Sequence, residues 1–174
     1  IIKTGVLRDM IDRTLYAVSQ DEKKPAHTGE LFEIELDKLT IVALDGYRLA
    51  IVERPITAVK DIRIIVPSKT MTEVSHLLAN DDEEDVHISA NRRYVVFTTA
   101  GYTIMSRLIE GEFLNYHNVI PSGSRTRVTL DTKEFIETIE RASLIITERL
   151  KNPLRISFTE GKVVVRCQTN LGRV

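Results

Sequence analysis

A repeated unit in the chain of 174 residues constrains its fold more than any other feature of the sequence. Three segments can be aligned, each with two strand-like runs around a turn: IELDKLTIVALDGYRLA, ISANRRYVVFTTAGYTI and ISFTEGKVVVRCQTNLG. The dipeptides Gly46-Tyr47 and Gly101-Tyr102 occupy corresponding places in the first two segments. Repetition with a period of roughly 55 to 70 residues is typical of a fold assembled from copies of one supersecondary unit. The chain therefore holds two copies and part of a third.

An amphipathic helix is predicted at the start of each copy. In the first, TGVLRDMIDRTLYAVS, apolar residues recur at helical spacing from Leu7 to Val18. The opposite face carries charged residues four positions apart, which predicts two ion pairs. These pairs are Arg8 with Asp12 and Asp9 with Arg13.

The other two helix patterns have recognisable beginnings. The second, SKTMTEVSHLLAN, follows Pro67, with Ser68 as its predicted N-cap, and ends at the acidic run DDEED. The third, DTKEFIETIERASLIITERL, opens with Asp131 and has Glu134 three residues later, which is a capping-box pattern.

Short strand-like segments separated by turn residues lie between the helices. They are too short and too closely spaced for crossover connections, so the sheets are expected to be mostly antiparallel with the helices on one face. This predicts an α+β fold. The segments are LFEIEL, LTIVAL, RLAIVE, IRIIVP, DVHISA, RYVVFTTA, YTIMSRLIE, RVTLD, LRISF and KVVVRCQT.

Composition and charge indicate an ordinary globular protein, with 43% hydrophobic and 28% charged residues. No apolar run reaches the roughly 20 residues that a membrane helix needs, so we expect a soluble intracellular protein. The formal net charge of -1 means that any binding to nucleic acid must come from a local basic patch. The single cysteine, Cys167, is expected to be a buried strand thiol.

Two motifs together resemble the bacterial DNA polymerase III beta subunit, the replicative sliding clamp. They are LDGYRLA at residues 44–50 and RLIEGEFLNYHNVIP at residues 107–121, and the helix-plus-strands repeat surrounds them. The resemblance implies the DNA-clamp fold, in which head-to-tail dimers of three-domain chains form a ring around duplex DNA. It implies that residues 1–120 are the middle domain and residues 121–174 the first half of the C-terminal domain, with the N-terminal domain absent.

The turn in LDGYRLA is where the resemblance places a groove for short hydrophobic peptides. Asp45 and Gly46 supply turn chemistry, and strand alternation puts Tyr47 and Leu49 on one face. The implied groove residues are His27, Leu44, Gly46, Tyr47, Arg48, Leu49, Leu114, Asn118 and Val119. Five of them differ from the residue common in the family, namely His27, Leu44, Tyr47, Leu114 and Asn118. The alternative is a plain hairpin turn with a core tyrosine and leucine.

Basic residues on the helices are candidates for contact with DNA phosphates, which is electrostatic and independent of base sequence. The resemblance matches Lys24 and Lys69 to the inner wall of the ring. Helical periodicity adds Arg8, Arg13 and Arg141. For each residue a solubilising surface charge remains the alternative.

The third helix has more apolar residues than one sheet face needs. Phe135, Ile139, Ala142 and Ile146 already form its inward stripe, so Leu144 and Ile145 widen the band. In clamps the matching pair closes the dimer interface. The alternative is burial within the chain, against the loop that follows.

The sequence leaves three classes of function to consider. The first is a non-catalytic clamp that encircles double-stranded DNA and binds the polymerase alpha subunit and clamp-loader subunits in the bacterial cytoplasm, at the nucleoid. The second is a peptide-binding module of the same architecture without DNA binding. The third, an enzyme, has no supporting motif, and we expect no cofactor. The four histidines are scattered, so no metal site is predicted, and DDEED reads as a solvated loop.

Overall fold

The computed structural model describes residues 1–79, 83–123, 125–146, 153–169 and 172–173. These residues form two compact units, Ile1–Asn115 and Tyr116–Val174. Within the described ranges, no helix is both long and apolar enough to cross a membrane.

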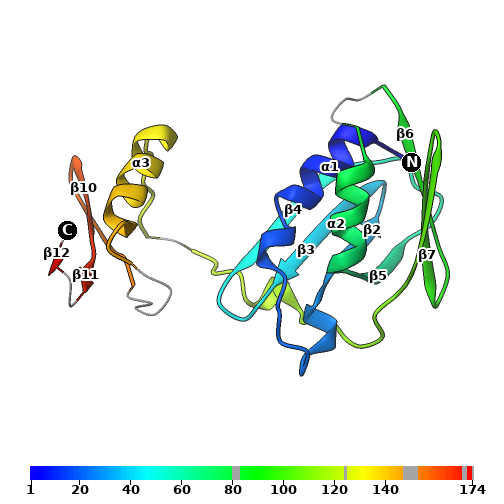
Figure 1. The fold of residues 1–174 in the computed structure, drawn as a ribbon, viewed down its shortest axis with the longest axis horizontal. Coiled ribbons are helices and arrows are strands. Elements are labelled where there is room, and N and C mark those ends of the chain that lie inside the picture. Colours follow the sequence, from blue (N-terminus) through cyan, green and yellow to red (C-terminus); the bar gives the residue numbers. More distant parts are fainter. Residues whose placement is uncertain (80–82, 124, 147–152, 170–171, 174) are drawn as a thin grey trace. The chain divides into compact units, whose positions relative to one another are not determined.

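The first unit contains two copies of one arrangement, a helix followed by a three-stranded meander (Figure 1). The elements of the first copy are β1 (Ile2–Lys3), α1 (Thr4–Asp12), the 3-10 turns η1 (Leu15–Ala17) and η2 (Pro25–His27), β2 (Gly29–Glu35), β3 (Lys38–Leu44) and β4 (Leu49–Pro55). Those of the second copy are β5 (Ile62–Pro67), α2 (Ser68–Leu77), β6 (Asp85–Ala90), β7 (Tyr94–Thr99) and β8 (Tyr102–Arg107). The predicted repeat and its strands are therefore present.

The first strand of each copy pairs with the meander of the other copy. The two sheets have the orders β4-β3-β2-β5 and β1-β6-β7-β8, and each strand pair in them is antiparallel. In one exchange Ile2 lies opposite Val86, and in the other Gly29 lies opposite Pro67. The two-residue β1 was not predicted, because it is too short to show a periodicity. The exchange joins both copies into one unit.

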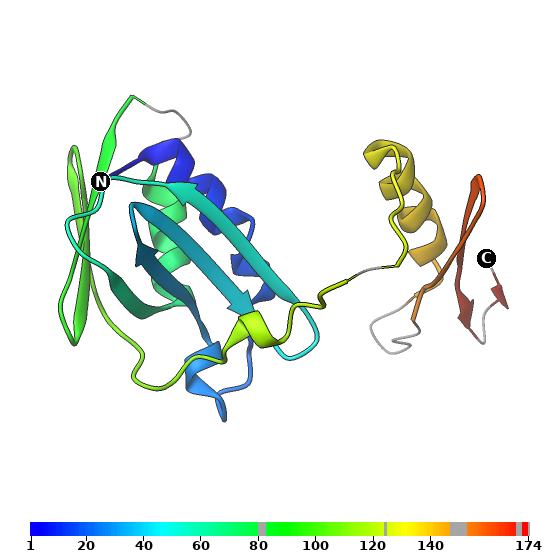
Figure 2. The same cartoon turned by 180° about the vertical axis from the view of Figure 1, so that it is seen from behind.

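The helices α1 and α2 lie next to each other over one face of the β2–β5 sheet, and Figure 2 shows the same sheet from its helix-free side. One apolar cluster lies beneath them and extends to the second sheet. It joins Leu7 and Met10 of α1 to Met71 of α2, Phe32 of β2 and Phe97 of β7. Full burial of such a side chain contributes about 1.5 to 3 kcal/mol. The predicted arrangement, with helices on one face of antiparallel sheets, is confirmed.

The first helix is shorter than the predicted span of residues 4–19. It ends at Asp12, and the hydroxyl of the buried Thr14 lies 2.9 Å from the carbonyl oxygen of Met10. A threonine that bonds back to the preceding turn competes with the helical backbone pattern and bends the chain. Both predicted ion pairs are present, at 2.6 Å between Arg13 and Asp9 and 3.8 Å between Arg8 and Asp12.

The start of α2 differs from the prediction. Pro67 is the N-cap residue and Ser68 is the first helical residue, with no side-chain capping bond. Pro67 already has the extended backbone that an N-cap needs, because it ends β5 opposite Gly29. Asp81 and Asp82 of the predicted solvated run lie outside the described residues.

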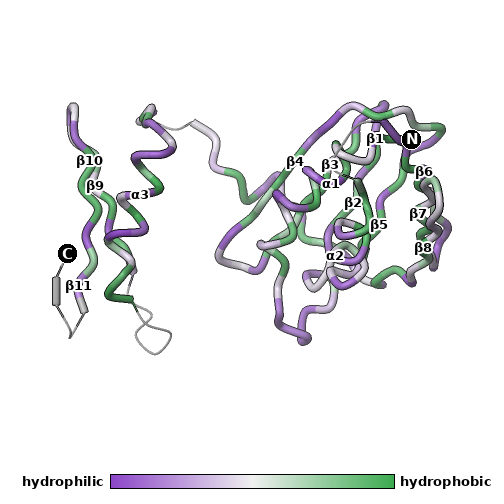
Figure 3. Tube along the Cα trace, turned by 45° about the horizontal axis from the view of Figure 1, so that its top comes forward, coloured by the Kyte–Doolittle hydropathy of each residue, from purple (hydrophilic) through white to green (hydrophobic). Residues whose placement is uncertain are grey.

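The second unit consists of the turn η3 (Tyr116–Asn118), α3 (Thr132–Ser143), the hairpin β9 (Arg155–Thr159) and β10 (Lys162–Arg166), and the short strands β11 (Gln168–Thr169) and β12 (Gly172–Arg173). The carboxylate of Asp131 accepts the amide of Glu134 at 2.8 Å, which confirms the predicted cap. In Figure 3 α3 alternates between hydrophilic and hydrophobic segments, as an amphipathic helix should. Residues 127–131, predicted as a strand, form no strand and pair with no strand in the part of the chain that the structure describes. Cys167 is buried.

Replacement of Ile2 by alanine tests the strand exchange. Ile2 is 5% exposed and belongs to the core cluster, whereas its neighbour Ile1 is 47% exposed. We expect Ile2→Ala to lower the free energy of unfolding of the first unit by about 2 kcal/mol or more. Ile1→Ala, the matched control, should change it by less than about 0.5 kcal/mol. Urea unfolding followed through the amide NMR signals of β6 would measure both, and equal effects would contradict a role for β1 in the second sheet.

Candidate functional site

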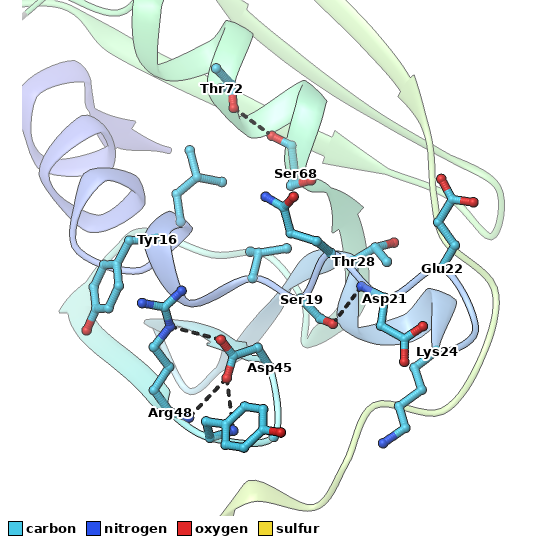
Figure 4. A pocket seen from close by; sticks show the side chains of 15 residues that line it. Tyr16, Ser19, Asp21, Glu22, Lys24, Thr28, Asp45, Arg48, Ser68 and Thr72 are labelled. Carbon is cyan, nitrogen blue, oxygen red and sulfur yellow. Dashed lines mark hydrogen bonds and ion pairs between the residues drawn. The ribbon is translucent and has the colours of Figure 1, made fainter. Parts of the chain in front are cut away.

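The turn between β3 and β4 is held by one carboxylate. Asp45 Oδ1 accepts the amides of Tyr47 and Arg48 at 2.9 and 3.0 Å, and its Oδ2 accepts the Nε of Arg48 at 2.9 Å (Figure 4). Gly46 has a φ of 92°, and Gly101, which occupies the corresponding turn of the second copy, has a φ of 102°. Only glycine adopts such angles without strain, so both positions require it.

These bonds also favour the ionised form of Asp45. Hydrogen bonds from the backbone amides of Tyr47 and Arg48 lower the pKa of its carboxyl, and the Arg48 side chain lowers it further. The carboxylate therefore remains ionised at neutral pH, and the bonds that hold the turn remain available.

The turn divides its apolar residues between core and solvent. Leu44 is buried and lies opposite the half-buried Leu49 in the β3–β4 ladder. Tyr47, at the tip, is 100% exposed. An aromatic side chain that is fully exposed does not have the core role of the plain-hairpin alternative.

Tyr16 of η1 lies beside this turn and was not identified from the sequence. The guanidinium carbon of Arg48 lies 5.5 Å from the centre of the Tyr16 ring, within the range of a cation–π interaction. Tyr16 and Arg48 are 32 positions apart in the chain, so no local pattern in the sequence indicates that they meet. The contact fixes Arg48 from a second side.

A pocket of about 1000 Å³ lies beside the Asp45 turn (Figure 4). Its walls come from η1, the following loop, the turn itself and the first turn of α2. They include the groove candidates Gly46, Tyr47 and Arg48 together with the DNA-contact candidate Lys24. The structure thus brings these four predicted residues to one pocket. Its labelled side chains are mostly polar or charged.

His27 lies in η2, and its ring makes an edge-on contact with that of Phe113 at a centroid distance of 5.6 Å. Partial burial and the nearby charge of Lys24 lower the pKa of His27, so the ring is neutral at pH 7. Leu114, next to the buried Phe113, is exposed. Phe113 was not singled out from the sequence, although it lies within the second motif. Asn118 and Val119 belong to the second unit, and both are exposed.

The basic candidates differ in their surroundings. Lys24, at the start of η2, and Lys69, in the first turn of α2, are exposed. Arg8 donates to the carbonyl of Leu78 at 3.1 Å, and Arg13 is paired with Asp9. Arg141 is exposed on α3. Arg8 is therefore partly occupied in joining α1 to the end of α2.

The candidate interface pair lies at the end of α3. Leu144 is the C-cap residue and is 80% exposed, whereas Ile145 is half-buried. The interface hypothesis predicts that at least one of these two side chains is exposed, and Leu144 is.

Comparison with known proteins gives matches along most of the chain. The family model for the DNA polymerase III beta subunit, central domain, matches residues 1–115. The beta sliding clamp of Bacillus subtilis is 33% identical over 158 residues, which are 90% of this chain and 42% of that protein. The beta sliding clamp of Halalkalibacterium halodurans is 35% identical, and the match covers 97% of this chain and 46% of that protein.

Among solved structures, a putative DNA polymerase III beta subunit from Eubacterium rectale superimposes with a TM-score of 0.95 at 31% identity. The superposition covers 99% of this chain and 47% of that one. The chain spans less than half the length of each of these relatives.

Substitution of Asp45 tests the account of the turn. We expect the NMR shifts of the Tyr47 and Arg48 amides to titrate together, with a midpoint below the ordinary aspartate value of 3.8, because both amides bond the ionised form. Since the pKa is lowered, the stabilisation of the turn is present at neutral pH and is lost as the pH falls through this midpoint. Asp45→Asn, which keeps the oxygen acceptor, should keep the turn and lose the titration. Asp45→Ala should also broaden or shift these signals at neutral pH. An unchanged spectrum in Asp45→Ala would contradict the account.

Proposed function

Because this chain belongs to the DNA polymerase III beta subunit family, we propose that it is part of a sliding clamp, a processivity factor that encircles duplex DNA and tethers the replicative polymerase. The observation that supports this most strongly is the superposition over 99% of the chain with a TM-score of 0.95 on a putative beta subunit. The proposed role is non-catalytic and is exercised in the bacterial cytoplasm, at the nucleoid.

Residues 1–120 are the proposed middle domain of the clamp, and residues 121–174 the first half of its C-terminal domain. The match of the central-domain model to residues 1–115 supports the first assignment. A helix followed by a strand hairpin in the second unit supports the second, because each copy in the first unit has the same order.

The Asp45 turn is the proposed wall of a groove for short hydrophobic peptides from the polymerase alpha subunit and the clamp loader. Three features support this role: the solvent-exposed ring of Tyr47, the half-buried Leu49 and the exposed Leu114. The hydrogen bonds of Asp45 form the turn without a bound peptide, and such preorganisation lowers the entropic cost of binding. Family resemblance assigns six further residues to the groove: His27, Leu44, Gly46, Arg48, Asn118 and Val119.

DNA is the proposed ligand of Lys24 and Lys69, with Arg8, Arg13 and Arg141 as further candidates. The exposed ammonium groups of the two lysines support phosphate contact, since such contact needs charge and reach but no base recognition. The family's head-to-tail dimer would use Leu144 and Ile145, and the exposed Leu144 supports this.

A double replacement tests the groove. We expect Tyr47→Ala with Leu49→Ala, made in the complete protein, to weaken binding of a fluorescent hydrophobic clamp-binding peptide by about 1 to 2 kcal/mol, because both apolar contacts are lost. Fluorescence anisotropy measures the affinity. Leu36→Ala with Val59→Ala is the matched control, since Leu36 and Val59 are exposed apolar residues outside the Asp45 turn. Unchanged affinity in the first variant would reject the groove.

A charge reversal tests the DNA assignment. Lys24→Glu with Lys69→Glu should weaken DNA binding by the complete dimeric ring at low salt and reduce the slope of log affinity against log salt by up to about 4, because each of the two subunits loses two phosphate contacts. Lys60→Glu with Arg92→Glu is the control for net charge, since both residues are exposed in turns and the pair gives the same change in charge. If both variants bind DNA alike, the two lysines are surface charges. If the complete unaltered protein fails to retain DNA, the peptide-binding module without DNA binding becomes the better assignment.

A further inference from the structure

Strand β2 carries a carboxyl group inside the protein. Glu30 is 0% exposed, and its neighbours Gly29 and Leu31 are buried as well. Most of β2 is therefore covered on both faces, so alternation along the strand offers Glu30 no route to water. Neither proposed ligand site of the clamp uses this residue.

The hydroxyl of Thr14 is the hydrogen-bond partner of Glu30. The Oγ1 of Thr14 lies 2.6 Å from Glu30 Oε1, 2.9 Å from the carbonyl oxygen of Met10 and 3.2 Å from that of Ile11. A hydroxyl has one proton to donate. The carbonyl of Met10 lies in the last turn of α1, where carbonyl groups have no backbone N–H of the same helix to accept from. If Thr14 donates to Met10, the proton between Thr14 and Glu30 must come from Glu30.

The second oxygen of Glu30 supports the same protonation state. Glu30 Oε2 is buried and has no hydrogen-bond partner among the described residues. A carboxylate in that position would be a buried charge without compensation, which is much more costly than a buried neutral acid.

The surrounding charges also disfavour ionisation. The pKa of Glu30 is raised to about 8, because burial and, to a smaller extent, the negative charge of Asp12 outweigh the opposite effect of the bond with Thr14. Asp12 is itself bonded to Ser75 and paired with Arg8. The other charged or titratable groups on elements around β2 are Asp9 and Arg13 on α1, Lys69, Glu73 and His76 on α2, Lys24 and His27 at η2, Lys38 on β3 and Arg63 on β5.

We propose that Glu30 is a neutral carboxylic acid at neutral pH, and that its proton joins β2 to the end of α1 through Thr14 as a pH-sensitive junction. Loss of this proton in mildly alkaline solution leaves the Thr14 hydroxyl as the only donor between the two groups, so its proton must turn from the Met10 carbonyl to the Glu30 carboxylate. Thr14 directly precedes η1, and Tyr16 of η1 contacts Arg48 of the Asp45 turn. Ionisation of Glu30 therefore changes the environment of Tyr16 as well.

The sign of the pH dependence follows from the direction of the pKa shift. The unfolded chain releases the Glu30 proton near pH 4.5 and the folded chain near pH 8. Between these values the folded state binds more protons, so stability falls as the pH rises and levels off above the folded pKa. The unfolding constant of the first unit should increase by up to about tenfold per pH unit in this window from this one group.

The test compares Glu30→Gln with Glu35→Gln in the 174-residue chain. Both remove one carboxyl from β2, but Glu35 is exposed at its end. Urea unfolding between pH 5 and 9 should show that stability falls with rising pH in the unaltered chain and in Glu35→Gln. In Glu30→Gln this pH-dependent fall should be absent, because the amide can donate to Thr14 at every pH. Parallel profiles in all three proteins would overturn the proposal.

A direct readout keeps the test decisive if Glu30→Gln fails to fold. In the chain labelled with ¹³C at glutamate carboxyls, one carboxyl resonance should titrate above neutral pH, and the Tyr16 amide should shift with the same midpoint. Thr14→Val should remove this linked shift at Tyr16, and Thr14→Ser should retain it. If all glutamate resonances titrate near 4.5, Glu30 is ionised at neutral pH and the proposal is wrong.

Discussion

Burial of one apolar cluster beneath α1 and α2 is the interaction on which the rest of the first unit depends. The cluster takes residues from both helices and both sheets, so the two copies of the repeat share their main core, and only a small cluster of Ala17, Val18, Ala43 and Ala50 lies within the first copy alone. Phe32 of one sheet meets Phe97 of the other at a centroid distance of 6.2 Å, in an edge-to-face geometry. The hairpin turn at Gly46–Arg48 lies outside this cluster and is exposed, so it remains available for contacts with other molecules.

The Asp45 turn is built differently from this core. Its shape comes from hydrogen bonds to one carboxylate, a glycine with positive φ and the contact between Arg48 and Tyr16, and it needs little apolar burial. A polar scaffold of this kind holds an apolar ring at the surface without drawing it into the core. Tyr47 is therefore exposed because of the local geometry, and the stability of the unit does not depend on its burial.

Sequence patterns predicted the elements with strong periodicity and missed features that depend on tertiary contact. The strands around LTIVAL and RYVVFTTA and the cap at Asp131 follow from local rules, and the structure contains them. Thr14, just after the end of α1 at Asp12, contacts Glu30 of β2, and no local pattern reveals a carboxyl buried in a strand. The groove candidates came from the family resemblance, because turn chemistry alone also fits a plain hairpin. Tyr16 and Phe113 were missed because their partners, Arg48 and His27, are distant in the chain.

The exchange of first strands has a consequence for biosynthesis. Ile2 pairs with Val86, so the amino-terminal strand leaves the ribosome 84 residues before its partner. At a synthesis rate of about 5 to 20 residues per second, the strand waits roughly 4 to 17 seconds. Helix α1 can form within microseconds, but its apolar face has no complete core to cover until β7 has emerged. During this interval the nascent chain exposes apolar surface, which makes it a substrate for chaperones that bind emerging polypeptides.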